Sequence, residues 1–280
     1  MGEKINVLDK GYVRLANDKF VKPIMGDDLS AVNAARVSFM KESLELTQKD
    51  IRLLDYLANH GHTSPFRHAT VTVEVKAPFM VARQWFKYRV GWEHGPDTAE
   101  LIGLAVPEEL APYFWDFIRE SLSWIPHGDD QGFWDLMYGR NEASRRYITL
   151  EPEFYIPKPT EWRSAPENKK QGSGEPLPEE IGAKLTKRLQ EKIERGLKDF
   201  EHALKLGVAP EIARGFIDCM YFMYTVWRWT ASLQGVAWFI YQRAVLDGAQ
   251  NEITQYAKAV WALLKPYFQH SLNKLVKKGA

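Results

Sequence analysis

Residues 69–89 read ATVTVEVKAPFMVARQWFKYR, and this stretch contains two different periods. In its first half, small apolar residues alternate with polar ones, which is typical of a strand with one buried face. The apolar positions are Ala69, Val71, Val73 and Val75. Pro78 suits the first turn of a helix, because the N–H that proline lacks is not needed there. The stretch therefore predicts a strand that leads directly into a helix.

The predicted helix has a buried stripe and a basic face. The stripe consists of Phe79, Ala82, Phe86 and Val90, at helical steps of three and four. Arg83 and Lys87 lie four residues apart on one face, where like charges destabilise an isolated helix by roughly a few tenths of a kcal/mol. An anion bound between the two side chains would turn this destabilisation into a stabilising interaction. The alternative is an ordinary solvated basic face.

A second basic stretch occupies residues 139–147, GRNEASRRY. The two basic stretches carry more hydrogen-bonding groups than a packed helix requires. Between them, residues 90–138 are rich in glycine, proline and tryptophan. Such an aromatic-rich segment is expected to fold onto the rest of the chain rather than to form a disordered linker. Short helices are expected at 108–123 and 130–138.

The remaining elements follow from apolar spacing. Helices are predicted at 31–39, 48–60, 178–206 and 249–268, with another beginning at Pro210. Residues 219–243 are almost entirely apolar or aromatic and predict a helix buried on most sides. Strands are expected within 1–22 and at 153–157, and residues 160–178 predict a polar surface loop. The predicted fold class is α/β (α+β), a single domain over 1–280 with a small mixed sheet, flanking helices and a helical carboxy-terminal half.

Composition excludes several classes of protein. A hydrophobic content of 45% in 280 residues supports a substantial core, and a formal net charge of +1 argues against a nucleic-acid-binding protein. Cys219 is the single cysteine, which excludes a disulfide framework and agrees with a reducing cytoplasm. No secretory signal and no membrane-spanning run is visible. We therefore expect a cytoplasmic protein with neither nucleic-acid nor membrane partners.

Common sites for cofactors and metals are also missing from the sequence. Neither of the glycine-rich nucleotide fingerprints occurs. The three neighbouring histidines, His60, His62 and His68, match no usual ligand spacing, so no metal is expected. Cys219 lies in an apolar run and is interpreted as inert core. Any anion site must therefore come from the local clusters of cations.

Four blocks, in order along the chain, resemble the flavin-dependent thymidylate synthases. The first is Met25-Gly26-Asp27-Asp28 with Ala34-Ala35-Arg36-Val37-Ser38-Phe39. The second begins at Gly61-His62-Thr63-Ser64-Pro65-Phe66-Arg67-His68 and runs to Arg83-Gln84-Trp85-Phe86. The third is Asn141-Glu142-Ala143-Ser144-Arg145-Arg146-Tyr147 with Glu153-Phe154-Tyr155-Ile156-Pro157. The fourth is Arg243 with Ala249-Gln250-Asn251-Glu252-Ile253-Thr254-Gln255-Tyr256-Ala257.

The chain departs from the family pattern in three places. Lys87-Tyr88-Arg89 stands where the family's signature opens with Arg-His-Arg, and 90–138 interrupts that signature as an insertion. Lysine at the first of these positions keeps the charge but loses the bidentate fork of arginine. Ser232, Gln234 and Trp238 occupy positions where the family has Asn and Arg in contact with flavin.

The resemblance implies reductive methylation of dUMP to dTMP. It also implies which residues bind dUMP: Gln84, Lys87, Glu142, Ser144, Arg145, Arg146, Arg214 and Arg243. Arg243 matches the catalytic arginine that contacts the pyrimidine, where a fixed guanidinium favours charge on the ring. The alternative role for Arg243 is a surface salt bridge to Asp247, which would contribute little.

The resemblance further implies FAD as cofactor, with NADPH and methylenetetrahydrofolate as co-substrates. The flavin contacts it implies are Ser64, Lys87, Tyr88, Arg89, Glu142, Ser232, Gln234 and Trp238. His62 is a further candidate beside flavin or folate, with a loop histidine bonded to backbone as its alternative. Family members are homotetramers with active sites shared between subunits, so the same assembly is expected here.

Three other functions remain open from the sequence. One is a related enzyme that methylates or hydroxymethylates UMP or a cytidine nucleotide such as dCMP, because selectivity depends on few contacts. Another is a nucleotide-binding paralogue that has lost the flavin, which the changes at Lys87 and Tyr88 motivate. A basic-aromatic nucleic-acid binder is disfavoured by the net charge.

Overall fold

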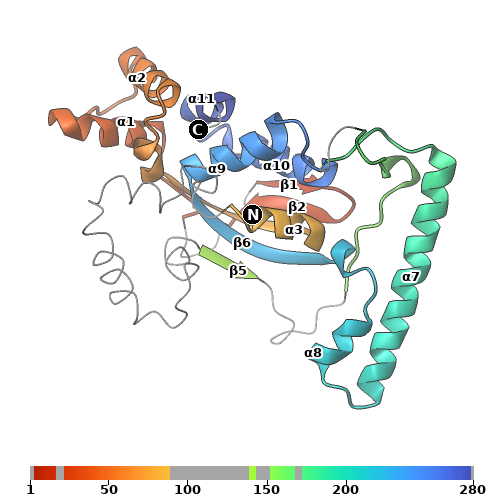
Figure 1. Cartoon of the computed structure of the whole chain (residues 1–280). Helices are drawn as coiled ribbons and strands as arrows, with labels where there is room; N and C mark the ends of the chain where they lie inside the picture. The colour runs from red at the N-terminus through yellow and green to blue at the C-terminus, as the bar shows by residue number, and fades with distance from the viewer. Residues whose placement is uncertain (1–2, 17–21, 89–138, 143–151, 168–171, 279–280) are drawn as a thin grey trace, which may run out of the picture.

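The computed structural model describes residues 3–16, 22–88, 139–142, 152–167 and 172–278, with 139–142 described as backbone only. The predicted helices at 108–123 and 130–138 lie outside these ranges. Within them, a curved antiparallel sheet forms the centre of the molecule (Figure 1). Its strands are β1 Lys4–Val7, β2 Gly11–Leu15, β3 Ile24–Met25, β4 Thr70–Pro78, β5 Gly139–Glu142 and β6 Tyr224–Ser232.

The strand order is β1-β2-β4-β6-β5, and β3 pairs with β4. The longest pairing joins β4 and β6, from Thr70 opposite Ser232 to Pro78 opposite Tyr224. The predicted α+β class and the strand at 69–75 are confirmed. All pairings between described strands are antiparallel, so the sheet is antiparallel rather than mixed.

Helices lie around this sheet. They are α1 Asp28–Arg36, α2 Gln48–Asn59, α3 Phe79–Trp85, α7 Glu179–Lys205, α8 Pro210–Ala213, α9 Leu233–Ile240, α10 Asn251–Leu264 and α11 Ser271–Lys278. Figure 1 shows α9 and α10 along one side of the sheet, α1 and α2 beyond one end, and the long α7 at the other end. The long helices expected from their apolar period, at 48–60, 178–206 and 249–268, are confirmed as α2, α7 and α10.

The predicted helix at 219–243 is wrong. Residues Tyr224–Ser232 form strand β6, and a helix, α9, begins only at Leu233. Along the strand, Trp227, Trp229 and Ala231 are buried while Arg228 and Thr230 are only partly covered. That alternation has the period of two of a strand, and large aromatic side chains suit a half-buried pleated surface. The overall apolar character of the segment hid this alternation.

Three smaller expectations also need correction. The buried face of α3 consists of Val81, Ala82 and Trp85, while Phe79 and Phe86 are only partly buried. Pro78 is the last residue of β4 and precedes the helix instead of forming its first turn. Similarly, residues 153–157 contribute only an isolated bridge, from Phe154 to Met223, and no full strand.

An aromatic cluster fixes α3 against the sheet. The Trp85 ring lies 5.5 Å from the ring of Trp227 and 5.5 Å from that of Trp229, both edge-on, and stacks on Phe239 of α9 at 4.2 Å. Burying large aromatic rings in such geometry contributes strongly to core stability. Trp229 Nε1 also donates to the backbone oxygen of Tyr88 at 3.1 Å, which holds the chain just beyond α3. The end of α3 is therefore rigidly placed.

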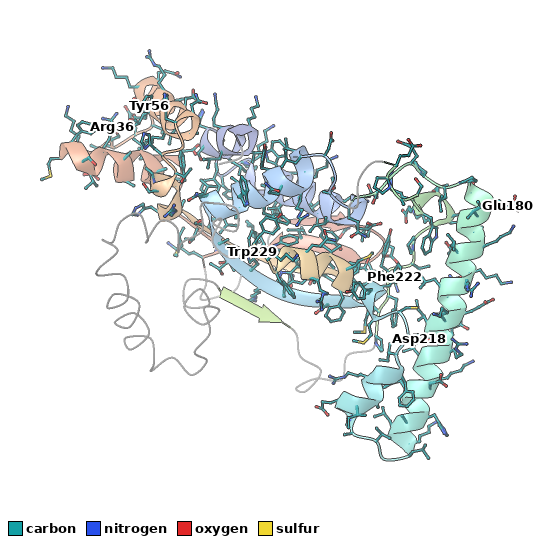
Figure 2. The ribbon with its side chains drawn as sticks, viewed as in Figure 1. Arg36, Tyr56, Glu180, Asp218, Phe222 and Trp229 are labelled. Atoms are coloured by element: carbon teal, nitrogen blue, oxygen red, sulfur yellow. The ribbon has the colours of Figure 1, made fainter. Side chains whose placement is uncertain are left out.

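Side chains are shown on the whole ribbon in Figure 2. Trp229 lies in the central body, Arg36 and Tyr56 lie at the α1–α2 end, and Glu180 and Asp218 lie at or beside α7. A second, smaller core under α7 includes Phe154, Leu189, Ile193, Ile217 and Met223. Within the described ranges, no helix has both the length and the apolar character needed to cross a membrane.

Candidate functional site

A cavity of about 590 Å³ lies between α3, the start of α10 and the loop before α7. It is lined by Met80, Gln84, Lys87, Pro157, Glu161, Trp162, Arg163, Ser164, Ala165, Gly172, Ser173, Phe222, Arg243, Gly248, Gln250 and Glu252. Three of the predicted site residues, Gln84, Lys87 and Arg243, are among these. They come from two segments more than 150 residues apart, so folding brings them together.

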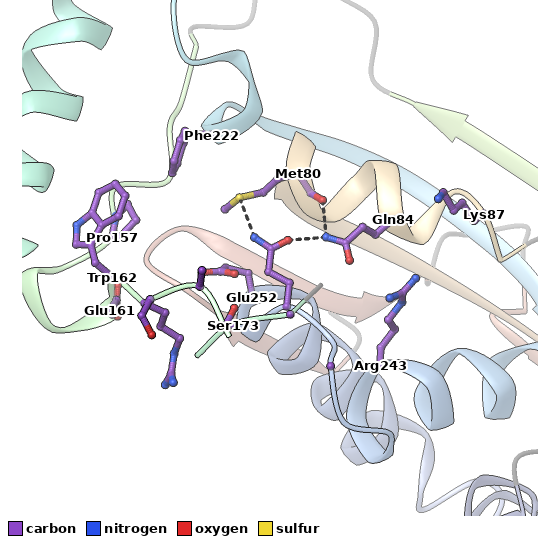
Figure 3. A pocket seen from close by; sticks show the side chains of 16 residues that line it. Met80, Gln84, Lys87, Pro157, Glu161, Trp162, Ser173, Phe222, Arg243 and Glu252 are labelled. Atoms are coloured by element: carbon purple, nitrogen blue, oxygen red, sulfur yellow. Dashed lines mark hydrogen bonds between the residues drawn. The ribbon is translucent and has the colours of Figure 1, made fainter. Parts of the chain in front are cut away.

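Gln84 and Lys87 belong to the end of α3 and the turn after it. The Gln84 amide nitrogen donates to the Met80 carbonyl oxygen at 3.1 Å and to Gln250 Oε1 at 2.6 Å (Figure 3). Lys87 is exposed and reaches the cavity, whereas Arg83 is exposed and does not line it. Any anion in the cavity is therefore placed on the Lys87 side of the helix.

Arg243 lies in a π-helical turn, Tyr241–Val245, that directly follows α9. Such turns are often found at functional sites. The Nε atom of Arg243 is buried and has no hydrogen-bond partner among the described residues. No ion pair to Asp247 forms within the described chain, so the alternative role is not realised. A buried donor without a partner is expected to bind a ligand group.

Figure 3 shows Arg243, Gln84 and Lys87 near one another, with Pro157, Trp162 and Phe222 toward the other end of the cavity. The guanidinium carbon of Arg243 lies 5.2 Å from the centre of the Tyr88 ring. A cation over an aromatic face is held by the ring's quadrupole. The cationic end of the cavity is thus preorganised, and it suits an anionic planar ligand.

The opposite wall was not predicted from the sequence. It comes from Glu161, Trp162 and Arg163, in a loop that was expected only to cover the surface. Burial raises the pKa of the cavity-lining Glu252 carboxyl, while Gln250 and Arg163 oppose this shift. No motif in the sequence marks Glu161, Trp162 and Arg163, since only the packing of the loop against α7 and α10 places them.

Close backbone contacts hold this loop against the carboxy-terminal part. Gly172 has φ +102°, and a Cβ there would lie 2.9 Å from the Gly248 carbonyl oxygen, so glycine is required. Ser173 Oγ accepts a hydrogen bond from the Asn251 N–H at 3.2 Å, which caps the start of α10. The described parts of the loop, 160–167 and 172–178, are thus held in place as a wall of the cavity.

Some of the predicted flavin contacts gather elsewhere, where the 3₁₀ turn Ser64–His68 meets the start of α9. Ser64 is exposed there, and Ser232 accepts a hydrogen bond from the Gly235 N–H at 3.2 Å. Gln234 is buried and accepts a hydrogen bond from Arg67 Nε at 2.6 Å. Neither Ser232 nor Gln234 lines the cavity that contains Arg243.

Three other predicted ligand contacts make ring contacts within the described chain. The Tyr88 ring is buried and lies 5.1 Å, edge-on, from the Phe239 ring. Trp238 is partly buried against the main core, with its ring 5.6 Å from that of Tyr241. His62 is exposed, and its ring stacks 6.2 Å from the ring of Tyr56.

Several predicted residues are not brought to the cavity by the described chain. Four of them lie outside the described residues: Arg89, Ser144, Arg145 and Arg146. Glu142, in β5, is described only as backbone and pairs with Trp227 of β6. Arg214 follows α8, which Figure 1 places beside α7 and away from α3 and α10. Within one chain, Arg214 therefore does not join the cavity.

Residues for other chemistry are not gathered in the described part of the chain. No group of three or more His, Cys, Asp or Glu side chains there is arranged to hold a metal ion. Burial raises the pKa of the Cys219 thiol, which disfavours the reactive thiolate at neutral pH. The described lining of the cavity offers the cations of Lys87 and Arg243 and the amide of Gln84 to a ligand.

Comparison with known proteins identifies the relatives of this chain. The sequence profile of the family described as "Thymidylate synthase complementing protein" matches residues 20–94 and 137–268. The chain belongs to this family. The predicted resemblance to flavin-dependent thymidylate synthases is thereby confirmed. This chain is therefore an enzyme of the thymidylate synthase type, which is a class of methyltransferase.

Individual relatives support the same family over nearly the whole chain. The flavin-dependent thymidylate synthase of Thermotoga neapolitana is 33% identical over 279 residues, covering 99% of this chain and 97% of the relative. That of Thermosipho africanus is 32% identical over 276 residues, covering 98% and 95%. This family is thus one of flavin-dependent enzymes.

A solved structure shares the fold of this chain. It is a UMP/dUMP methylase, PolB from Streptomyces cacaoi bound with 5-Br dUMP, with a TM-score of 0.69, 20% sequence identity and 98% of each chain covered. The profile match leaves residues 95–136 unmatched, within the segment predicted as an insertion at 90–138. That this segment is an insertion stays a prediction.

Proposed function

We propose that this chain catalyses the reductive methylation of dUMP to dTMP, with methylenetetrahydrofolate as carbon donor and FAD and NADPH as reductants. One observation carries the proposal: Gln84, Lys87 and Arg243 meet in a single cavity of a chain that belongs to this family. Two cations and an amide match a nucleotide, which has an anionic phosphate and a polar base edge. Flavin-dependent relatives and a UMP/dUMP methylase of the same fold support this substrate class.

Arg243 is the proposed catalytic residue. Its guanidinium has a buried Nε that lacks a partner among the described residues, and the Tyr88 ring lies beside it. Placed against the pyrimidine, it would stabilise the negative charge that develops on the ring as C5 becomes nucleophilic. Preorganised donors of this kind contribute strongly because they need no reorganisation during the reaction.

The phosphate of dUMP is proposed to bind to cations. Lys87 is the one that reaches the cavity from α3. Arg145, Arg146 and Ser144 are proposed partners from the second basic stretch, together with Glu142. Arg214 is proposed to act in a cavity of another subunit, because within one chain it lies apart from Arg243.

The flavin site is proposed at the junction of the Ser64–His68 turn and the start of α9. Ser64 is exposed, and Ser232 keeps its O–H available as a donor while it caps α9, so both fit a polar ligand at this edge. Arg89, Lys87 and Glu142 are proposed to complete it, with Gln234, Tyr88 and Trp238 supporting it and His62 near the flavin or folate. When bound, FAD supplies the hydride that NADPH provides.

We propose a homotetramer whose active sites are shared between subunits. Among the described residues, the dUMP candidates Gln84, Lys87 and Arg243 line one cavity, while the flavin candidates Ser64, Ser232 and Gln234 lie elsewhere on the chain, and this separation supports a site shared between subunits. Exposed apolar residues between α1 and α2, Phe39, Met40 and Leu44, are further support for association. A cytoplasmic location is part of the same proposal and is supported by the single cysteine, while the near-neutral net charge supports the expectation of no nucleic-acid partners.

UMP is the second candidate substrate. The PolB structure of the same fold was also solved bound with 5-Br UMP, at a TM-score of 0.67. Discrimination between ribose and deoxyribose requires contacts with a single hydroxyl group, so related sites can differ in it.

Flavin absorbance and labelled nucleotides test the proposal. Purified protein should show bound flavin absorbance after FAD is added. It should also release tritium from C5-labelled dUMP when methylenetetrahydrofolate and NADPH are present. Labelled UMP and dCMP, assayed in parallel, identify the preferred base and sugar. Protein that binds dUMP but no flavin would instead support a paralogue that has lost the cofactor.

A further inference from the structure

Gln84 and Gln250 form an amide pair at the edge of the cavity whose orientation the backbone determines. The Met80 carbonyl oxygen can only accept a hydrogen bond, so the Gln84 atom 3.1 Å from it must be the nitrogen. The same nitrogen lies 2.6 Å from Gln250, which must therefore present its oxygen, Oε1. Both N–H groups of the Gln84 amide are thereby used.

The remaining atom of this amide, Gln84 Oε1, is an acceptor at the cavity. None of the described residues donates a hydrogen bond to it, and Gln84 lines the cavity. Figure 3 shows the Gln84 oxygen turned toward the side on which Arg243 lies. The cavity thus offers an acceptor from Gln84 beside the donors of Arg243.

Gln250 is itself held in place by its backbone. Its carbonyl oxygen accepts from both the N–H and the hydroxyl of Thr254 at 3.1 Å, and the next residue, Asn251, donates to Ser173. Its amide nitrogen lies 3.7 Å from the Met80 sulfur, a weak acceptor. Without Gln250, one N–H of Gln84 would lose its partner and the Gln84 side chain could turn.

We propose that Gln250 is a positioning residue that acts through Gln84 and gives the cavity its preference for a ligand with a hydrogen-bond donor. This inference rests on the proposed function. The donor of a uridine nucleotide is either the imide N3–H of the base or a sugar hydroxyl. If the donor is the imide, Gln84 Oε1 would accept from N3–H of uracil while Arg243 donates to a neighbouring carbonyl oxygen of the base. Cytosine would not fit in this way, because its N3 is an acceptor.

A double-mutant cycle tests the coupling. Gln250→Met keeps the length of the side chain but removes the acceptor, and it should weaken dUMP binding about five- to tenfold, as expected for one misplaced hydrogen bond. Gln84→Met should weaken binding at least as much. The double variant should lose clearly less than the sum of the two single losses, because the effect of Gln250 that passes through Gln84 is already lost in Gln84→Met. Additive losses would overturn the inference.

Nucleotide analogues identify the donor. The ratio of affinities for dUMP and 3-deaza-dUMP, which lacks N3–H, should fall in Gln250→Met if the imide is the partner of Gln84. If the sugar hydroxyl is the partner of Gln84, the ratio of affinities for dUMP and 2′,3′-dideoxy-UMP should fall in Gln250→Met instead. Gln250→Glu keeps an acceptor for Gln84, and both ratios should stay at wild-type values, since the added charge acts equally on all three nucleotides.

Two outcomes separate failure of this inference from failure of the proposed function. Wild-type protein that binds dUMP, with both ratios unchanged in Gln250→Met, overturns the positioning role alone. Wild-type protein that binds neither dUMP nor UMP in calorimetry overturns the proposed function and this inference with it. Thermal unfolding of each variant establishes that the folded protein is being compared.

Discussion

The guanidinium carbon of Arg243 lies 5.2 Å from the centre of the Tyr88 ring, so the predicted catalytic arginine rests against an aromatic side chain in the signature segment. Tyr88 is buried, and its ring is fixed edge-on to Phe239. The ring therefore holds the cation of Arg243 at the cavity.

This contact predicts different outcomes for two substitutions of Tyr88. Tyr88→Phe keeps the aromatic face and should leave kcat for dUMP methylation within about threefold of wild type, whereas Tyr88→Leu should lower kcat at least about tenfold, as expected for a partly desolvated cation–π contact. Steady-state kinetics, with thermal unfolding as control, measure both. A large loss in Tyr88→Phe would mean that the hydroxyl, and not the ring, is the important group.

Lys87 and Arg83 are a matched pair of cations with different expected roles. Both are exposed and belong to the α3 segment, but only Lys87 lines the cavity. Lys87→Ala should weaken dUMP binding at least about tenfold, because hydrogen bonds to charged groups contribute about 1.5–3 kcal/mol. Arg83→Ala should change the affinity little. Equal effects of the two substitutions in calorimetry would argue against a specific phosphate contact by Lys87.

Gly182 links helix α7 to the far wall of the cavity. A Cβ at this position would lie 1.8 Å from the Pro159 carbonyl oxygen, in the turn that leads to Glu161 and Trp162. Gly182→Ala should therefore displace this turn, lower the free energy of unfolding by about 1–3 kcal/mol and weaken nucleotide binding. Gly215→Ala, where a Cβ meets open space, is the control. Unchanged unfolding and binding in Gly182→Ala would show that the turn can move freely.

Asp50 should make stability depend on pH. Burial alone would raise the pKa of its carboxyl, but hydrogen bonds from Thr47, Arg36 and Ser43 hold the pKa well below its usual range. Because the pKa is lowered in the folded state, the stabilisation is complete above the unfolded value of about 3.9 and is lost as pH falls below it.

Asp50→Asn should lower the free energy of unfolding at neutral pH by about 3 kcal/mol, because it leaves the half-buried Arg36 without its ion pair. The variant should also lose less stability than wild type between about pH 5 and pH 3. Glu180→Gln is the control, since its pair with Lys184 is exposed and contributes little. Denaturant unfolding at several pH values measures this, and parallel curves for wild type and Asp50→Asn would contradict it.

Local periodicity predicted the elements that obey one period over their whole length. Helices α2, α7 and α10 have apolar residues at steps of three and four, and strand β4 alternates strictly. Strand β6 was missed because its few polar residues, such as Arg228 and Thr230, stand in a segment that is otherwise rich in apolar and aromatic residues and leads directly into the buried helix α9. Its pairing with β4 joins residues from Thr70 with Ser232 to Pro78 with Tyr224, which are far apart in the sequence, and no local signal specifies that register.

The site residues that could be predicted are those whose side chains are charged or polar enough to bind a ligand directly. Arg243, Lys87 and Gln84 were chosen as charged or amide groups in blocks that resemble the family, and they line one cavity. Glu161, Trp162 and Arg163 were missed because their position depends on how the loop packs against α7. The role of Gln250 was missed for the same reason, since only its contact with Gln84 reveals it.

The most direct test of the central claim is the conversion of dUMP by purified protein, with the product identified by chromatography, for wild type and Arg243→Ala. With FAD, NADPH and methylenetetrahydrofolate present, wild type is predicted to form dTMP. Arg243→Ala should be slower by a factor of about 100 or more, as expected when a preorganised donor is removed. Formation of dTMP at the same rate by Arg243→Ala, or no methylated product from dUMP or UMP by wild type, would contradict the account.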